Sequence, residues 1–278
     1  MVNKNIIETL HLFTKIDFEL IELLKSLSPN EWNCQTIAKL WTVKDVASHL
    51  LDGNLRALSV SRDNYILEST ENINSFQELT SYINNLNNSW VSATKRLSPK
   101  IIINLLEITN SEYYNHLKTL NLFDEAIYSV AWSGQSSSPN WFHIAREYTE
   151  KFLHQQQIRD ALGRQGIMTK ELFYPFVDIL MYAFPYTFRQ IDAMNGTIVS
   201  IKVNSDIGGI WSIIKTSSGW ILDKSQNLNA TSIVIINPDT LWKLFSKSLK
   251  PEDVLDKVEM KGDLNYAKHM LSIVAVMA

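Results

Sequence analysis

The feature that most constrains the fold is a change of sequence pattern near Asn195 and Gly196. Before this point, apolar residues recur at the three- and four-residue spacing of amphipathic helices, as over residues 5–27. After it, short stretches rich in β-branched and aromatic residues alternate with glycines, as over 197–203 and 210–215. We therefore predict a two-domain α+β protein, in which a helical bundle precedes a small domain built around a sheet.

Local signals at the start of two segments indicate where helices begin. Thr42 and Asp45 have the spacing of a capping box, which predicts a helix over about 43–63. Residues 75–78 form a second box of this kind, with a helix expected to reach about Leu97. These helices supply part of the bundle.

Glycine and proline mark further helix ends. A long helix is expected to end at Gly163, and another spans about 170–189, where Pro175 and Pro185 should bend or terminate it. A terminal helix is predicted over 264–277. The expected organisation is a bundle over 1–164, a helical connector over 165–195 and an α+β domain over 196–278.

Composition narrows the class of protein. The chain has 278 residues, of which 45% are hydrophobic, so it should bury sizeable cores. Its net charge is −3 and it lacks a basic stripe, so nucleic-acid binding is not expected. The sequence contains no run of eighteen apolar residues, so no membrane span is predicted. Residues 1–8 lack the pattern of a signal peptide. Cys34 is the one cysteine, which excludes an internal disulfide. We expect a cytoplasmic protein that meets neither membrane nor nucleic acid.

The strongest chemical signal is a histidine on one predicted helix and a Glu-x-x-x-His pair on another. Glu150 and His154 share one helical face because they are four residues apart. A neighbouring antiparallel helix could bring His49 to the same point. Two imidazoles and one carboxylate can bind a divalent metal and leave a coordination position open for water or substrate.

The alternative interpretation is an ordinary surface pair of Glu150 and His154 on a helix, which spacing alone does not exclude. Phe152, Leu153 and Ile158 surround the pair, so this stretch is not expected to be freely solvated. A buried carboxylate beside a histidine is costly without a partner, and a cation would remove that cost.

Three further polar residues are candidates to contact the metal ligands and orient them. Asp52 lies three residues beyond His49, while His143 and Arg146 precede Glu150 on its helix. The ordinary alternatives are a helix-surface carboxylate for Asp52, a surface or capping role for His143 and a solvated ion pair for Arg146.

Taken together, these segments resemble a known family, the mycothiol-dependent maleylpyruvate isomerases. The N-terminal part looks like their DinB-like metal-binding four-helix bundle, and the C-terminal part looks like their sterol-carrier-like α+β domain. The resemblance covers nearly the whole chain. The stretches that carry it are 41–52, 61–63, 150–161, 208–211, 219–220, 241–245, 262–263 and 273–278.

The resemblance implies that His49, Glu150 and His154 bind zinc or a similar divalent ion. It also implies that a low-molecular-weight thiol occupies the open position, where coordination would deprotonate it. The arginine that the family brings to this site, in a Gly-Arg stretch after the tryptophan helix, is absent here. Lys247 could take its place, although lysine lacks the bidentate fork of arginine.

The connector is rich in apolar residues, which predicts a packed interface rather than a flexible tether, with the C-terminal domain closing over the metal end of the bundle. Arg189 and Lys247 are then the catalytic candidates, facing an anionic ligand. The expected function is that of a metal-dependent enzyme acting on a small molecule, a thiol-dependent isomerase or S-transferase that activates a thiol or water. The alternatives are a non-enzymatic protein that binds a small apolar ligand in its C-terminal domain and a partner-binding module with a vestigial site.

Overall fold

The computed structural model describes residues 6–65, 73, 75–223 and 229–276. The chain divides into two compact units, each made of segments that are not contiguous in sequence. The helical unit comprises residues 8–127 and 139–167, and the sheet unit contains 128–138 and 168–276. The domain boundaries that the sequence suggests at residues 164 and 195 stay a prediction.

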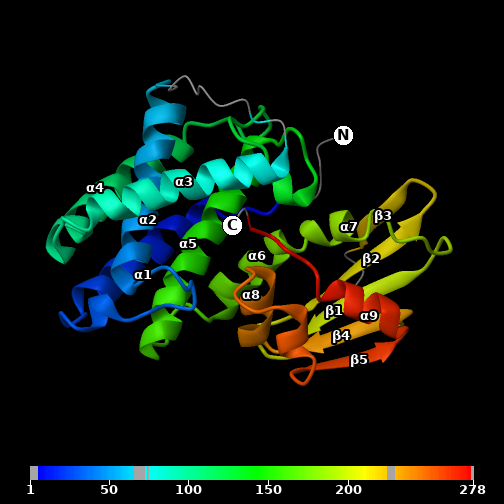
Figure 1. The fold of residues 1–278 in the computed structure, drawn as a ribbon. Helices are drawn as coiled ribbons and strands as arrows, with labels where there is room; N and C mark the ends of the chain where they lie inside the picture. The colour runs from blue at the N-terminus through cyan, green and yellow to red at the C-terminus, as the bar shows by residue number, and fades with distance from the viewer. Residues whose placement is uncertain (1–5, 66–72, 74, 224–228, 277–278) are drawn as a thin grey trace. The chain divides into compact units, whose positions relative to one another are not determined.

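The helical unit is built around α2, which packs against α3, α4 and α5, while α1 packs against α4 and α5 (Figure 1). Short 3₁₀ segments precede α1 and α2. The five helices span Phe13–Lys25 (α1), Val43–Ala57 (α2), Phe76–Thr94 (α3), Pro99–Leu117 (α4) and Asn140–Leu162 (α5).

The helix starts that the sequence indicates are formed as expected. The Thr42 side chain accepts from the Asp45 backbone N–H, and the Asp45 carboxylate accepts from the Thr42 N–H at 3.0 Å, a complete capping box. A π-helical turn extends α2 over Leu58–Arg62, so the predicted end near residue 63 is confirmed. At the other end of the unit, α5 ends at Gly163, which has the left-handed φ of +62° that favours glycine.

The core of the helical unit is apolar on the facing sides of α1, α2 and α4, but α5 differs. From Tyr148 to Arg159 the side chains of α5 are buried on nearly every side, the polar ones included, with Glu150 partly exposed. Buried polar groups need partners. Lys151 accordingly donates to Asp17 Oδ1 at 2.7 Å and to Asn110 Oδ1 at 2.9 Å. The apolar core includes Leu20, Leu24, Val46, Leu50, Leu51, Ile102, Leu106 and Ile158.

The sheet unit contains a mixed five-stranded sheet in the order β3-β2-β1-β4-β5. Strands β1 and β4 run parallel and the other neighbours antiparallel. The elements span Lys170–Leu180 (α6), Ala183–Thr187 (α7), Ile198–Val203 (β1), Ile210–Thr216 (β2), Gly219–Asp223 (β3), Ser232–Ile236 (β4), Pro238–Phe245 (α8), Val258–Gly262 (β5) and Leu264–Met270 (α9). An α+β fold with a helical N-terminal part is therefore confirmed.

Helices cover one face of this sheet. Val199, Ile201 and Ile213 are buried on that face. An aromatic cluster joins α7, β3 and α9, since Phe188 contacts both Trp220 and His269 at ring-centroid distances of 5.2 and 4.8 Å. This packing explains why the short helix α9 is held on the sheet.

Two predicted helices differ in the structure. The helix expected over 170–189 is divided into α6 and α7, since the chain turns at Met181 and Tyr182, with the Tyr182 N–H bonding to Ile179 three residues back. The terminal helix ends at Met270, where the N–H groups of Leu271 and Ser272 bond three residues back, and Ala275 then donates its N–H to the carbonyl of Phe245. The predicted end at residue 277 lies outside the described residues.

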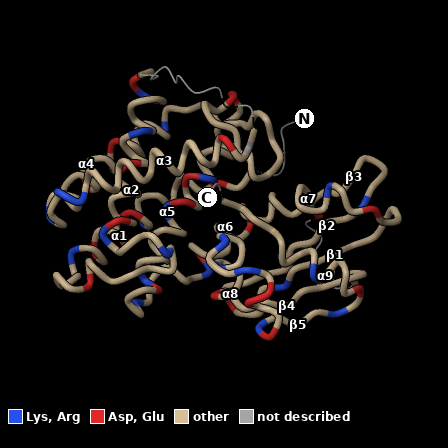
Figure 2. The backbone as a smooth tube through the Cα atoms, viewed as in Figure 1, with Lys and Arg blue, Asp and Glu red and all other residues tan. Residues whose placement is uncertain are grey.

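Acidic and basic residues are interspersed in both units (Figure 2), in line with the small net charge. None of the described helices combines the length and the apolar character that a membrane crossing requires.

Candidate metal centre

Helices α2 and α5 bring three potential metal ligands together. His49 comes from the middle of α2, and Glu150 and His154 come from successive turns of α5. One ligand atom from each of the three lies within 4.8 Å of the other two. His154 Nε2 lies 3.4 Å from Glu150 Oε2. The cluster that the spacing predicted is therefore present as a geometric arrangement.

An indole packs against both histidines. The ring centroid of Trp41 lies 4.7 Å from that of His49 and 6.1 Å from that of His154. Trp41 immediately precedes the capping residue Thr42, so the local geometry that starts α2 also sets the indole beside the ligands. The sequence motif contained Trp41, but nothing in its spacing indicated that it forms a wall of this site.

His49 is suited to bind a cation. Its Nδ1 is buried and has no hydrogen-bond partner among the described residues. Burial, followed by the charges of His154 and Arg56, holds the pKa of His49 well below its usual range. The imidazole is therefore neutral at physiological pH and keeps a lone pair available.

The donor set fits a divalent cation. A buried imidazole nitrogen without a partner, a second imidazole and a carboxylate are the nitrogen and oxygen ligands that zinc binds in catalytic sites with an open position. Glu150 is partly exposed, with 29% of its side chain accessible, so one side of the cluster opens to solvent.

Asp52 is buried close to this region but faces another partner. Its Oδ2 lies 3.0 Å from Arg56 Nε, an ion-pair contact whose angle is outside that of a hydrogen bond. Burial raises the pKa of the Asp52 carboxyl, and Arg56 opposes this shift. A supporting role of Asp52 toward His49 stays a prediction.

His143 and Arg146 belong to a separate polar cluster nearer the start of α5. Arg146 Nη2 lies 2.9 Å from His143 Nδ1, and Arg146 also pairs with Glu147. Burial and then the charge of Arg146 lower the pKa of His143 to about 4. His143 and Arg146 are therefore paired within this cluster. Their role in orienting Glu150 stays a prediction.

The two basic candidates, Arg189 and Lys247, lie in the sheet unit. The guanidinium of Arg189 stacks 3.9 Å from the ring centroid of Tyr186 and donates to the Tyr186 carbonyl. Lys247 follows α8 with a left-handed φ of +59°. Their role toward an anionic ligand stays a prediction.

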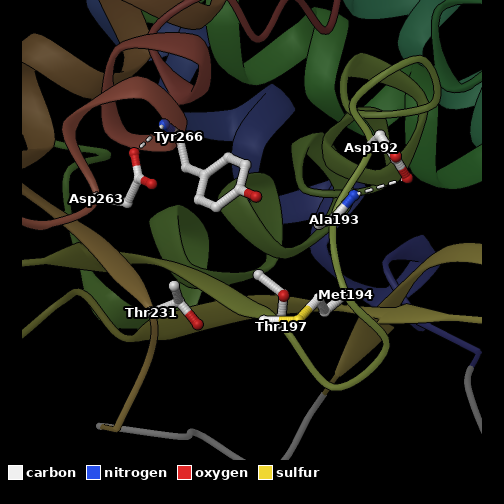
Figure 3. A pocket seen from close by; sticks show the side chains of 7 residues that line it. All are labelled: Asp192, Ala193, Met194, Thr197, Thr231, Asp263 and Tyr266. Atoms are coloured by element: carbon white, nitrogen blue, oxygen red, sulfur yellow. Dashed lines mark hydrogen bonds between the residues drawn. The ribbon is translucent and has the colours of Figure 1, made fainter.

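The sheet unit has a cavity of about 480 Å³ between the segment before β1 and the start of α9. In Figure 3, Asp263 and Tyr266 stand on one side of it, and Asp192 and Ala193 on the other. Polar and apolar side chains both line it, so the lining alone does not select the class of ligand. The lining residues are Asp192, Ala193, Met194, Thr197, Thr231, Asp263 and Tyr266.

Comparison with known proteins relates the fold, but not the sequence, to a known enzyme. No family model matches the chain, and no curated protein sequence matches it. The solved structures with a similar fold include mycothiol-dependent maleylpyruvate isomerase, at 11% identity, and a variant of it with a histidine replaced by alanine, at 10%. Each has a TM-score of 0.55 and the match covers 91% of both chains. The chain therefore has a fold similar to that of this isomerase over nearly its whole length.

Proposed function

We propose that this protein is a metal-dependent enzyme in which His49, Glu150 and His154 hold one divalent cation, with zinc the best match to the ligand set. The observation that carries the proposal is the convergence of the three ligand atoms within 4.8 Å from two different helices. The buried Nδ1 of His49, which has no described partner, supports the proposal because such an atom is costly unless something binds it.

The side chains of this chain would prepare the site for chemistry. The two imidazoles and the carboxylate would leave coordination positions open, and Trp41 would exclude water from the side on which it packs. A divalent cation bound here would lower the pKa of a coordinated thiol or water and so supply a nucleophile at neutral pH. Because His49 is held neutral, it would not compete with the cation by carrying a proton.

We further propose that the substrate is a small electrophilic or anionic organic molecule and that a low-molecular-weight thiol takes part, as in an isomerase or S-transferase. The similarity in fold to a mycothiol-dependent isomerase supports this class of reaction. At 11% identity the similarity extends to the fold alone, so the substrate and the thiol are proposals that require direct assay.

The test combines zinc-loaded protein with mycothiol, bacillithiol, glutathione or no thiol, and offers maleylpyruvate and a panel of simple electrophiles. We expect turnover with at least one combination and expect His49→Ala to abolish it, because the variant lacks one of three ligands. His11→Ala is the matched control, since His11 is exposed and outside the cluster.

A specific pattern of results would contradict the proposal. If no combination shows turnover that depends on His49, and apolar ligands bind tightly to the protein, then a non-enzymatic binding function replaces the one proposed here.

A further inference from the structure

One hydrogen bond determines how His154 can act within the cluster. His154 Nδ1 lies 2.9 Å from Oε1 of Gln157, three residues further along α5. Both residues are buried, at 9% and 5% exposure. The other ring nitrogen, Nε2, is the one that approaches Glu150 Oε2 at 3.4 Å. The two nitrogens of this imidazole therefore face two different side chains.

With its oxygen facing the ring, the Gln157 amide places the hydrogen on Nδ1 of His154. A carbonyl oxygen can only accept a hydrogen bond, so Nδ1 must be the nitrogen that carries the hydrogen in this contact. In a neutral imidazole, Nε2 then bears the lone pair. In that neutral form Nε2 and the Glu150 carboxylate oxygen present electron pairs to each other, and either a bound cation or a second proton on Nε2 would relieve this.

We propose that Gln157 is a positioning residue that holds His154 in the Nδ1–H tautomer and directs the Nε2 lone pair toward the metal cluster. This inference rests on the proposed metal-dependent function. It accounts for an amide that is buried on α5 and whose oxygen makes this contact. Partners of ligating histidines commonly set the tautomer and orientation of the ring in this way.

The competing arrangement is well defined. If the Gln157 amide were reversed, its NH₂ group would donate to Nδ1, the hydrogen would move to Nε2, and Nε2–H would bond to Glu150. His154 and Glu150 would then form a closed structural pair with no lone pair left for a metal. The tautomer of His154 therefore distinguishes the two arrangements.

The experiment compares Gln157→Leu, which removes the acceptor, with Gln157→Glu, which keeps one. The matched control is Gln156→Leu, because Gln156 is the neighbouring glutamine on α5, is similarly buried at 8% exposure and has an Oε1 with no described partner. Zinc affinity is measured by competition with a chromophoric chelator. Long-range ¹H–¹⁵N NMR of the metal-free protein at pH 8.5 identifies the tautomer of His154, assigned by the signals missing in His154→Ala.

We expect Gln157→Leu to weaken zinc binding by about 10- to 100-fold, the usual effect of losing such a partner. Gln157→Glu should restore most of the affinity, and Gln156→Leu should change it by less than about threefold, since no bond to a ligand is lost. In the wild-type protein the NMR spectrum should show hydrogen on Nδ1 of His154. In Gln157→Leu the Nε2–H form should gain population.

Two results would overturn the inference. Hydrogen on Nε2 in the wild-type protein would do so even if Gln157→Leu failed to fold. Unchanged zinc affinity and unchanged tautomer in a folded Gln157→Leu variant would do so as well, and would leave the proposed metal site intact. Absence of zinc binding by the wild-type protein would instead refute the proposed function, and the tautomer would still decide the role of Gln157.

Discussion

The imidazole rings of His49 and His154 meet edge to face, with centroids 4.6 Å apart and planes at 76°. Edge-to-face contact is an ordinary packing geometry of aromatic rings, so the ring contact by itself does not indicate a metal. Together with Glu150, the two histidines form a three-sided cluster in which each member offers an atom to a common point. This relationship leads directly to a test of metal binding.

We predict one divalent metal ion per chain. His49→Ala, Glu150→Ala and His154→Ala should each reduce the bound metal well below stoichiometry without unfolding the bundle, because the apolar core is formed by other residues. Elemental mass spectrometry of the purified variants measures this directly, with His11→Ala as the control. Full metal content in all three ligand variants would contradict the assignment of these residues as metal ligands.

Metal affinity should also depend on pH. The ligands must be deprotonated to bind, so protons compete with the metal in acid. Because burial holds the pKa of His49 well below its usual range, this histidine should contribute to the loss of affinity only at the acid end. Chelator competition at pH 8, 7, 6 and 5 should show affinity falling with acid, and a profile that stays flat down to pH 5 would contradict the assignment of the three ligands.

The buried ion pair of Lys151 and Asp17 should be strongly coupled. Lys151→Met leaves a carboxylate buried beside the bundle core, and breaking such a pair typically costs about 3–5 kcal/mol in the free energy of unfolding. The double variant Asp17→Leu, Lys151→Met should be less destabilised than the sum of the single variants. Urea unfolding of the complete double-mutant cycle measures the coupling.

An exposed pair in the same unit is the control for that experiment. Lys25 Nζ lies 2.7 Å from Glu107 Oε1, yet about half of the Lys25 side chain is accessible. Exposed pairs contribute little, so Lys25→Met should change stability far less than Lys151→Met. Equal effects would show that burial is not what makes the Lys151 pair important.

His143 should make stability depend on pH. Burial and then Arg146 lower its folded-state pKa to about 4, whereas the unfolded value is about 6.5. The unfolded chain therefore binds a proton between these values while the folded protein does not. The contribution of His143 to the free energy of unfolding is fully present above about pH 6.5 and falls by roughly 3 kcal/mol as the pH drops to about 4.

The comparison of wild type with His143→Gln isolates this contribution, since other titrating groups are common to both. Urea unfolding at pH 8, 6, 5 and 4.5 should give a shallower loss of stability with acid in the variant. Parallel curves for the two proteins would mean that His143 is not the group responsible.

The capping box at the start of α2 should contribute measurably to stability. Thr42→Ala removes the acceptor for the Asp45 N–H and should lower the free energy of unfolding by about 1 kcal/mol. Ser89→Ala serves as a control, because Ser89 is exposed in the interior of α3 and caps no helix. Equal effects of the two substitutions would contradict the role assigned to the box.

The sequence by itself determined the features that depend on neighbouring residues. The capping box of Thr42 and Asp45 and the left-handed Gly163 act within one turn of the chain, so their residue types alone indicate where α2 begins and α5 ends. The shared face of Glu150 and His154 follows from helical spacing for the same reason.

Tertiary structure decided everything that depends on which surfaces meet. The packing of α2 against α5 brings His49 to the other two ligands and Trp41 over both histidines. Sequence spacing permitted this approach but could not require it, because many helix pairings bury similar apolar faces. The contact of Gln157 with His154 likewise could not be predicted from the sequence, which has three consecutive glutamines at this point of α5. Which of them faces a ligand depends on the side-chain packing around a helix that is buried on nearly every side.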